Sequence, residues 1–373
     1  MQPLSIYIHL PFCKKKCPYC DFNVSTTSNK TLHERYYSSL KKELNHKLRS
    51  VKNKHVVSIY FGGGTPSLTP PEIISDIVKT IHQSINIGST CETTIECNPE
   101  QSSINIDALL DAGINRFSVG IQSFDDRELT ILGRTHSANE AVSFIEELNK
   151  YHVENISIDL MYDCPSQSLH SWQQSLKIAT QLPITHISLY NLEFMPKTPF
   201  FRRQKELKPQ CPSEKTSLSQ LKCAQTLLKK HHLHQYEISA FAKKSYESVH
   251  NTSYWSGIDY IGVGLGASQF YEGVRSKNIT QFNQYISTDF HLQKTSIETL
   301  PHTDESKLQL ILHLRKLNGF NYDTFKMNWV VSEETHSQLI QLKNSLMLDI
   351  QDNVIKLTDK GLYQFDTLAS TLV

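Results

Sequence analysis

Short apolar segments alternate with helical patterns through the first part of the chain. The six candidate strands cover residues 4–10, 56–61, 93–97, 116–121, 156–161 and 185–190. Apolar residues at helical spacing follow them over residues 32–48, 71–85, 106–112, 138–151, 169–181 and 213–231. This alternation predicts right-handed crossovers and an α/β fold with a parallel sheet. Six units are too few for a closed eight-stranded barrel, so a partial barrel or a doubly wound sheet would fit.

Polar and glycine-rich segments lie at the ends of these candidate strands. They are residues 9–13, 62–66, 98–100 and 122–123, together with Asp159 and Asn191. In both fold types the carboxyl ends of the parallel strands carry the chemistry. The sequence therefore predicts an active-site mouth at this edge of the sheet.

The pattern changes twice in the second half of the chain. Residues 245–270 are rich in glycine and tyrosine and look like a loop, whereas helical patterns return after about residue 301 and include a possible hairpin in "LMLDIQDNVIKL". We expect three parts: a core over residues 1–240, a loop-rich extension over 241–300, and a small, mainly helical domain over 301–373.

Composition narrows the class of protein. The chain has 373 residues, 39% of them hydrophobic, and a formal net charge of +1, so no overall field favours nucleic acid. No apolar run approaches the roughly 20 residues needed to span a bilayer. Eight cysteines without the pattern of a signal peptide favour reduced thiols. We expect a cytoplasmic protein without a transmembrane segment, for which peripheral contact with a membrane stays open.

Three of the cysteines form a compact array. Cys13, Cys17 and Cys20 have the spacing C-x3-C-x2-C. Zinc is one interpretation, with His9 as a fourth ligand, although this spacing is unusual for zinc. Uncoordinated core cysteines fit poorly because three lysines stand among them. A [4Fe–4S] cluster fits better, since three thiolates leave one iron open to another molecule.

The array on the loop after the first strand, followed by "GGGTP" after the second, resembles the radical SAM superfamily. The resemblance implies a partial (β/α)6 barrel with a [4Fe–4S] cluster on the three cysteines. S-adenosylmethionine (SAM) would bind the fourth iron and be cleaved to methionine and a 5′-deoxyadenosyl radical. By position in the family's motifs, the SAM site would comprise Tyr7, Tyr19, Gly63, Gly64, Thr65, Glu96, Gln122, Arg134 and Asp159.

A narrower resemblance runs over nearly the whole chain. "YIHLPFCKKKCPYCDF", "YFGGGTPSL", "IECNPE", "GINRFSVGIQSFDDRELTILGRTH" and "DYIGVGLGAS" are similar to the oxygen-independent coproporphyrinogen III oxidase group. That group holds the oxidase and the HemW-type haem chaperones, both with a small C-terminal HemN-like domain. Two features favour the chaperones: Phe22 stands where the oxidase has a fourth cysteine, and "HNTSYW" from His250 matches their HNxxYW motif.

The resemblance therefore implies a haem chaperone, with His250 as the candidate haem ligand. Its partners would be haem, acceptor haem apoproteins such as respiratory enzymes, and an electron donor such as a flavodoxin or ferredoxin. Whether SAM chemistry belongs to the function stays open, and so does classification as an enzyme. The alternative is the oxidase reaction, in which radical SAM chemistry decarboxylates two propionates to give protoporphyrinogen.

One segment departs from the family pattern. Asp163 and Cys164 stand where the group has Gly-Leu, close after Asp159. An added carboxylate and thiol there could alter the wall of the SAM site. We expect the change from glycine to cost least if the backbone at Asp163 has a negative φ.

Overall fold

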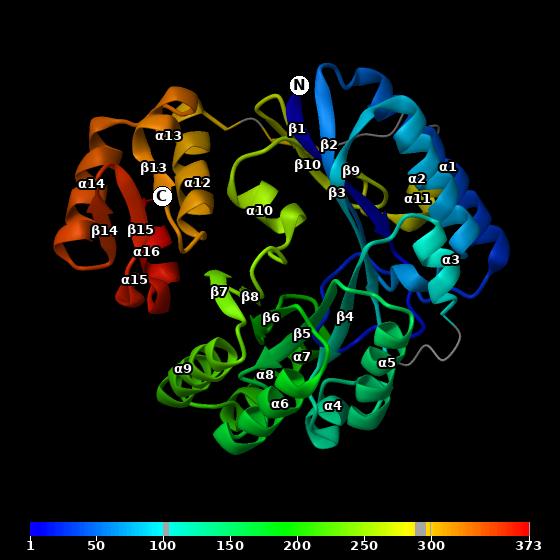
Figure 1. Cartoon of the computed structure of the whole chain (residues 1–373), viewed down its shortest axis with the longest axis horizontal. Helices are drawn as coiled ribbons and strands as arrows, with labels where there is room; N and C mark the ends of the chain where they lie inside the picture. Colours follow the sequence, from blue (N-terminus) through cyan, green and yellow to red (C-terminus); the bar gives the residue numbers. More distant parts are fainter. Residues whose placement is uncertain (100–103, 288–295, 299, 373) are drawn as a thin grey trace.

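Six parallel strands form the centre of one large sheet in the computed structural model, which describes residues 1–99, 104–287, 296–298 and 300–372. They follow one another in chain order across the sheet (Figure 1). The strands are β1 (Gln2–Leu10), β2 (Lys54–Gly63), β3 (Asn86–Cys97), β4 (Arg116–Gln122), β5 (Ile156–Tyr162) and β6 (His186–Asn191). The predicted strands and the parallel sheet are confirmed, and β3 begins seven residues earlier than the sequence predicts.

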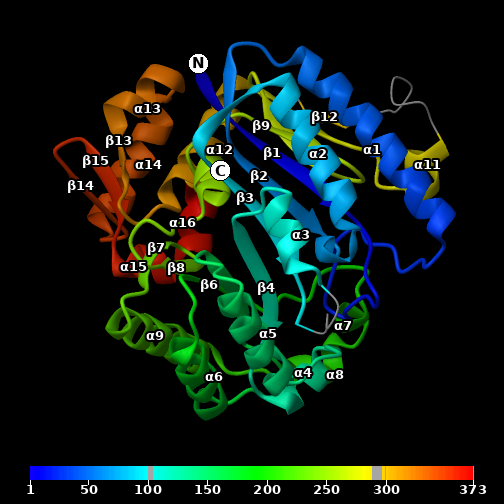
Figure 2. The same ribbon diagram turned by 45° about the vertical axis from the view of Figure 1, so that its right-hand side comes forward.

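Helices cover the outer face of this curved sheet (Figure 2). They are α1 (Lys30–Ser50), α2 (Pro71–Ser84), α3 (Ile106–Asp111), α4 (Asp126–Ile131), α5 (Ala138–Lys150), α6 (Leu169–Gln181) and α9 (Glu214–Lys230). Except for α4, their apolar faces pack on the strands in one large core, which explains the helical spacing in the sequence. Only α4 among these was not predicted; its six residues are too few for a periodic pattern, and the Asp125 side chain caps its first turn.

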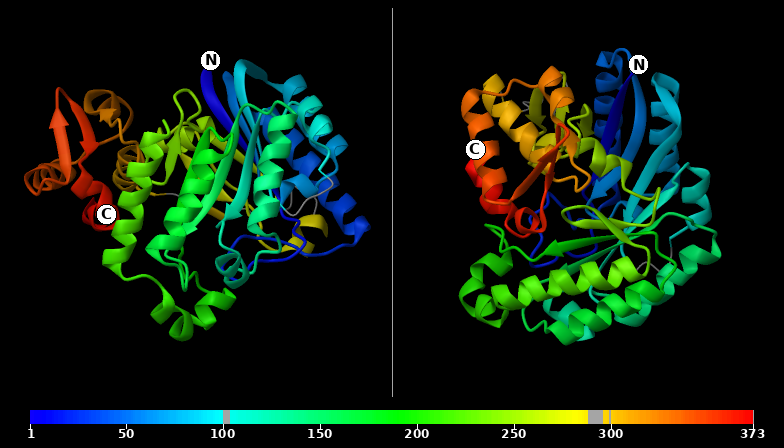
Figure 3. Two further views of the ribbon diagram at one scale, coloured as in Figure 1. Left: turned by 60° about the horizontal axis from the view of Figure 1, so that its bottom comes forward. Right: turned by 60° about the vertical axis from the view of Figure 1, so that its left-hand side comes forward.

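The sheet continues beyond both edges of the parallel strands and stays open. On one side β9 (Tyr260–Val263) runs parallel to β1, followed by β10 (Ser268–Tyr271), β11 (Val274–Lys277) and β12 (Ser296–Glu298). On the other side β8 (Ala240–Ala242) and β7 (His234–Glu237) are antiparallel additions. Figure 3 shows this sheet from two further sides.

The expectation of a loop over residues 245–270 is wrong. This segment contains α10 (Val249–Trp255), β9 and most of β10. The helix is short, and the side chain of Ser248 caps it by accepting a hydrogen bond from the backbone N–H of Asn251 at 3.2 Å. Elements of four to seven residues are too short for hydrophobic periodicity to reveal.

A second hydrophobic cluster holds the C-terminal part together. The C-terminal part lies beside α10 (Figure 1) and meets the main sheet at β7, where the N–H of Leu317 donates to the carbonyl of Tyr236 at 3.0 Å. The helices are α12 (His302–Leu314), α13 (Tyr322–Asn328), α14 (Glu333–Asn344), α15 (Asp359–Tyr363) and α16 (Phe365–Leu372). A small sheet joins β13 (Phe320–Asn321), β14 (Leu348–Gln351) and β15 (Val354–Leu357). The mainly helical character and the hairpin are confirmed, and the domain boundaries stay predictions.

Short helices complete the fold. They are α7 (Pro199–Arg202) and α8 (Gln204–Leu207), which follow β6, and α11 (Phe282–Ser287), which packs on α1. In the part of the chain that the structure describes, no helix combines the length and the apolar composition needed to cross a membrane.

Candidate functional site

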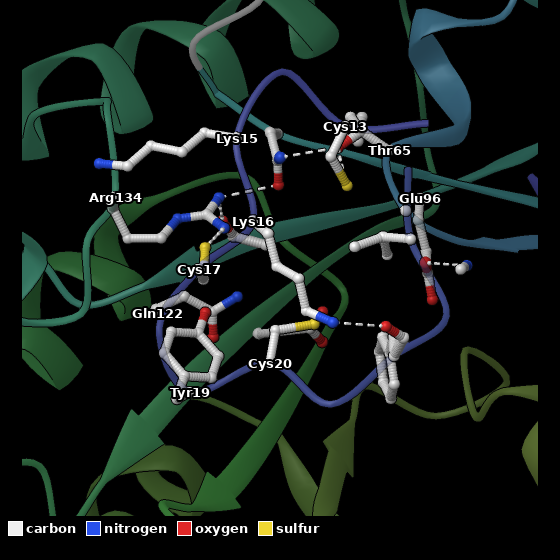
Figure 4. A pocket seen from close by; sticks show the side chains of 18 of the residues that line it. Cys13, Lys15, Lys16, Cys17, Tyr19, Cys20, Thr65, Glu96, Gln122 and Arg134 are labelled. Carbon is white, nitrogen blue, oxygen red and sulfur yellow. Dashed lines mark hydrogen bonds between the residues drawn. The ribbon is translucent and has the colours of Figure 1, made fainter. Parts of the chain in front are cut away.

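The carboxyl ends of the parallel strands surround a pocket of about 290 Å³ (Figure 4). It lies at the small end of the volumes typical of small-molecule sites. Every residue that the sequence assigns to the cluster or to SAM lines it, except Tyr7. These are Cys13, Cys17, Tyr19, Cys20, Gly63, Gly64, Thr65, Glu96, Gln122, Arg134 and Asp159. A pocket therefore lies where the strand-end pattern predicts it, although Asn191 does not line it and residue 100 lies outside the described residues.

The loop between β1 and α1 carries the three cysteines. Backbone hydrogen bonds hold it: the N–H of Cys13 donates to the carbonyl of Ser25 at 3.0 Å, and that of Cys20 to the carbonyl of Cys17 at 3.1 Å. Lys16 Nζ donates to the carbonyl of Phe22 at 2.9 Å, as Figure 4 shows. The array is thus a closed turn that points its thiols into the pocket.

The glycine segment at the end of β2 supports this loop from below. The N–H of Gly64 donates to the carbonyl of Leu10 at 2.8 Å, and the N–H of Thr65 donates to the carbonyl of Phe12 at 2.8 Å. A Cβ at Gly64 would lie 2.6 Å from the Phe12 carbonyl oxygen, closer than Cβ atoms approach backbone in proteins. The glycine is required because two backbones meet here.

A chain of hydrogen bonds joins two of the cysteines across the pocket. Thr65 Oγ1 donates to Cys13 Sγ at 3.7 Å, and Asn98 Nδ2 donates to Thr65 Oγ1 at 3.1 Å. Arg134 donates from Nη2 to Asn98 Oδ1 at 2.8 Å and from Nη1 to Cys17 Sγ at 3.6 Å. Both sulfur atoms therefore face donors, which stabilise a thiolate. The sequence assigned no role to Asn98, although its place after β3 was a signal.

The three thiols are the candidate metal ligands of this pocket. Burial raises the pKa of Cys13 to about 11, so a metal must displace its proton. Zinc needs about four donors within roughly 2.3 Å of one point. Among the residues that the structure describes, no group of three or more His, Cys, Asp or Glu side chains has that convergence. Cluster cysteines each bind a different iron, so the three thiols of this pocket fit a [4Fe–4S] cluster.

His9 does not complete a zinc site. Its ring nitrogens bond to Tyr7 Oη at 3.0 Å and to the carbonyl oxygen of Asn23 at 2.8 Å, and it does not line the cysteine pocket. Burial lowers the pKa of His9 to about 4, so the ring is neutral. It acts as a structural link between β1 and the cysteine loop.

Two partly exposed carboxyl groups line the pocket. Glu96 accepts from Tyr60 Oη at 2.8 Å and from the N–H of Gly63 at 3.0 Å, and burial raises its pKa to about 7. Burial also raises the pKa of Asp159 to about 6, against the opposing effects of Ser188 and nearby arginines. Such groups accept hydrogen bonds from hydroxyl or ammonium groups of a ligand.

Gln122 and Tyr19 both line the pocket and lie near each other in Figure 4. Gln122 has φ 75°, at a register shift between β4 and β5. Bulges of this kind redirect a side chain at the end of a strand. The Tyr19 ring meets the ring of Phe200 edge-on, with centroids 6.2 Å apart, which fixes the tyrosine between the second and third cysteines.

Tyr7 and His250 lie in a neighbouring pocket of about 450 Å³. Gly63, Glu96 and Phe22 line both pockets. Tyr60 connects them, because its hydroxyl donates to Glu96 and its ring stacks on His250 with centroids 4.8 Å apart. Tyr7 therefore lies in the His250 pocket, on the other side of the wall that Phe22, Gly63 and Glu96 form between the two pockets.

His250 stands in the first turn of α10 and is 1% exposed. Its Nδ1 bonds to Ser58 Oγ at 2.9 Å and its Nε2 to Tyr254 Oη at 2.7 Å. Burial lowers the pKa of His250 to about 3, so the imidazole is neutral. Either nitrogen can bind a metal only after it loses its present partner.

Asp163 and Cys164 lie outside the cysteine pocket. Asp163 has φ 61°, so the condition under which the change from glycine would cost least is not met, and its side chain accepts a hydrogen bond from Ser217 Oγ. Aspartate tolerates this left-handed conformation better than most residues. Cys164 is fully buried in a small apolar cluster. The departure from the family pattern therefore leaves the lining of the cysteine pocket unchanged.

Comparisons with known proteins agree with this geometry. The Radical SAM superfamily domain matches residues 7–179. "Heme chaperone HemW" of Buchnera aphidicola is 36% identical over 293 residues, 76% of each chain, and the protein of that name from Lactococcus lactis is 31% identical over 96% of this chain and 94% of its own. The solved structure of coproporphyrinogen III oxidase (HemN) from Escherichia coli, a radical SAM enzyme, aligns with this chain at a TM-score of 0.85 and 22% sequence identity. The alignment covers 100% of this chain and 90% of that chain.

Proposed function

Because this chain belongs to the HemN-like radical SAM proteins, in their HemW group, we propose that it is a haem chaperone. It binds a [4Fe–4S] cluster, SAM and haem, and it delivers haem to acceptor apoproteins in the cytoplasm, including respiratory haem enzymes. The observation that carries this proposal is the pair of adjoining pockets, one lined by three cysteines and the other by the HNxxYW helix.

In the first pocket Cys13, Cys17 and Cys20 hold the cluster as thiolates. The hydrogen bonds from Thr65 and Arg134 to two of these sulfurs support that role. When bound, the cluster supplies one electron for cleavage of the SAM sulfonium.

SAM is bound by the residues that match the family's SAM motifs. Glu96 and Asp159 accept from its hydroxyl and amino groups, Arg134 offers a cation to its carboxylate, and Tyr19 covers the loop side. The open backbone of Gly63, Gly64 and Thr65 admits the methionine part. Gln122 supplies an amide group to SAM. Tyr7 does not touch SAM directly; its ring stacks on the ring of Tyr60 with centroids 6.1 Å apart, and it thereby positions Tyr60.

Haem is the cargo and binds on the His250 side. The imidazole is neutral, which suits an axial ligand, but its Nε2 is hydrogen-bonded to Tyr254. Haem ligation therefore requires Tyr254 to turn away, and its ring then offers an aromatic face to the macrocycle.

One anaerobic experiment separates this function from the oxidase reaction. The reconstituted protein is mixed with SAM, reductant and coproporphyrinogen III, and mass spectrometry follows porphyrins and 5′-deoxyadenosine. A chaperone leaves the porphyrinogen untouched, whereas protoporphyrinogen formed over several turnovers would identify an oxidase. A parallel titration with haem is expected to give a Soret band that is lost in His250→Ala.

A further inference from the structure

Basic side chains stand on two segments that meet beside the cysteine pocket. We name this group the basic collar; it consists of Lys14, Lys15, Lys16, Lys197, Arg202, Arg203, Lys205 and Lys208. All eight side chains are exposed. They come from two segments, the cysteine loop and the stretch around α7 and α8 that follows β6.

The two segments are in direct contact. The N–H of Phe200 donates to the carbonyl of Pro18, between the second and third cysteines, at 3.0 Å. The rings of Tyr19 and Phe200 pack edge-on. Figure 2 shows α7 beside the cysteine loop. The collar is therefore one surface built from residues nearly 200 positions apart.

The charge of this surface differs from that of the whole chain. Residues 13–22 hold three lysines against one aspartate, and residues 193–208 hold five lysines and arginines against two glutamates. The two segments together carry a net charge of +5, whereas the chain as a whole carries +1. Positive charge is thus concentrated where the cysteines lie.

The collar also gives access to the thiols. Lys15 and Lys16 line the cysteine pocket, and Cys17 and Cys20 are partly exposed beside them. Two aromatic rings stand on the same segments, with Phe22 58% exposed and Phe201 36% exposed. A surface that combines cations with exposed aromatic rings suits a brief contact with an acidic protein surface.

We propose that the basic collar is the docking surface for an acidic one-electron carrier protein, such as a flavodoxin, that reduces the cluster. This inference rests on the proposed function and adds the place and charge of the partner. In the step, one electron leaves the reduced carrier, which is oxidised by one unit, and enters the cluster, which is reduced by one unit; no group is transferred. Electron-transfer encounters use small interfaces and depend on charge complementarity.

An anionic membrane surface is the competing partner for such a face. A helix that lies in a membrane interface needs a large apolar face. The helices of the collar, α7 and α8, have four residues each. The observations therefore favour a protein partner, and membrane binding becomes an outcome of the test.

The test compares two triple variants with the same change of charge. The collar variant is Lys14→Gln/Arg202→Gln/Lys205→Gln, which spares the lysines that line the pocket. The control is Lys42→Gln/Lys230→Gln/Lys343→Gln, on exposed positions of α1, α9 and α14. Binding of oxidised flavodoxin is measured by titration at low and high salt. Bleaching of the cluster by reduced flavodoxin and by dithionite is timed in parallel.

The collar variant is expected to bind flavodoxin roughly tenfold more weakly at low salt, with the difference vanishing at high salt. Its reduction by dithionite, which needs no docking surface, stays at the rate of the native protein, and the control matches the native protein throughout. Equal flavodoxin binding by both variants would overturn the proposal, as would collar-dependent binding to phosphatidylglycerol vesicles without flavodoxin binding. Failure of dithionite to bleach the native protein would instead refute the proposed cluster. The flavodoxin titration would still test whether the basic collar is a docking surface.

Discussion

Replacing Gly64 by alanine tests how the fold positions the cysteines. The added Cβ would lie 2.6 Å from the Phe12 carbonyl oxygen and 2.6 Å from the Pro11 carbonyl carbon. Carbon and oxygen atoms normally stay at least about 3.3 Å apart, so the cysteine loop must retreat by roughly 0.7 Å. The neighbours are backbone atoms, which cannot rotate away as a side chain would.

This displacement is large for a metal site and modest for the fold. Ligand distances tolerate only about 0.2 Å, so we expect Gly64→Ala to lose most of its iron. Overpacking of this kind costs about 1–3 kcal/mol of the free energy of unfolding, which lowers Tm by several degrees without unfolding the chain. Gly88→Ala is the matched control, since the nearest atom there, the Val56 carbonyl oxygen, is 3.4 Å from the new Cβ.

The assay is iron and sulfide per chain after anaerobic reconstitution, with circular dichroism to follow Tm. Gly88→Ala is expected to keep the native iron content. If Gly64→Ala also kept native iron and native Tm, the contact between the glycine segment and the cysteine loop would not position the cluster.

Three further changes test other parts of the site. Cys17→Ser should abolish the cluster absorbance, and an intact spectrum would contradict the array. Burial raises the pKa of Glu96 from about 4.5 to about 7, so the folded protein binds this proton more tightly than the unfolded chain does. The stability that the bound proton contributes is fully present below pH 4.5 and is lost as the pH rises through 7. In urea unfolding, the free energy of unfolding of Glu96→Gln should therefore increase relative to that of the native protein between pH 4.5 and 7, by up to about 3 kcal/mol. If the difference between the two proteins did not change with pH, the raised pKa of Glu96 would be refuted. Tyr254→Phe removes the hydrogen bond to His250 Nε2 and should raise haem affinity several-fold in a Soret titration; unchanged affinity would exclude Nε2 as the ligand.

The strands and most helices of the core were readable from the sequence because their patterns are local. Alternating apolar strands and helical spacing recur every few residues, and β1 to β6 lie where those patterns predict. The elements that escaped detection are short: α4, α10 and β9 have four to seven residues. The caps of α4 and α10, Asp125 and Ser248, are local, but a cap alone does not reveal a short helix. The pairing partner of β9 is β1, which lies far away in the sequence.

In the candidate site, too, local features were readable from the sequence and contacts between distant segments were not. The sequence alone determined the spacing of Cys13, Cys17 and Cys20 and the run of glycines after β2, because both are local. The need for glycine at Gly64 comes from the tertiary structure, because the Phe12 backbone approaches it from the cysteine loop. Only the tertiary structure decided that Asn98 and Arg134 join two cysteines and that Tyr7 lies on the His250 side of the wall. It also decided that the two basic segments meet. Strand ends far apart in the chain become neighbours only through the register and curvature of the sheet, and side-chain direction there depends on features such as the bulge at Gln122.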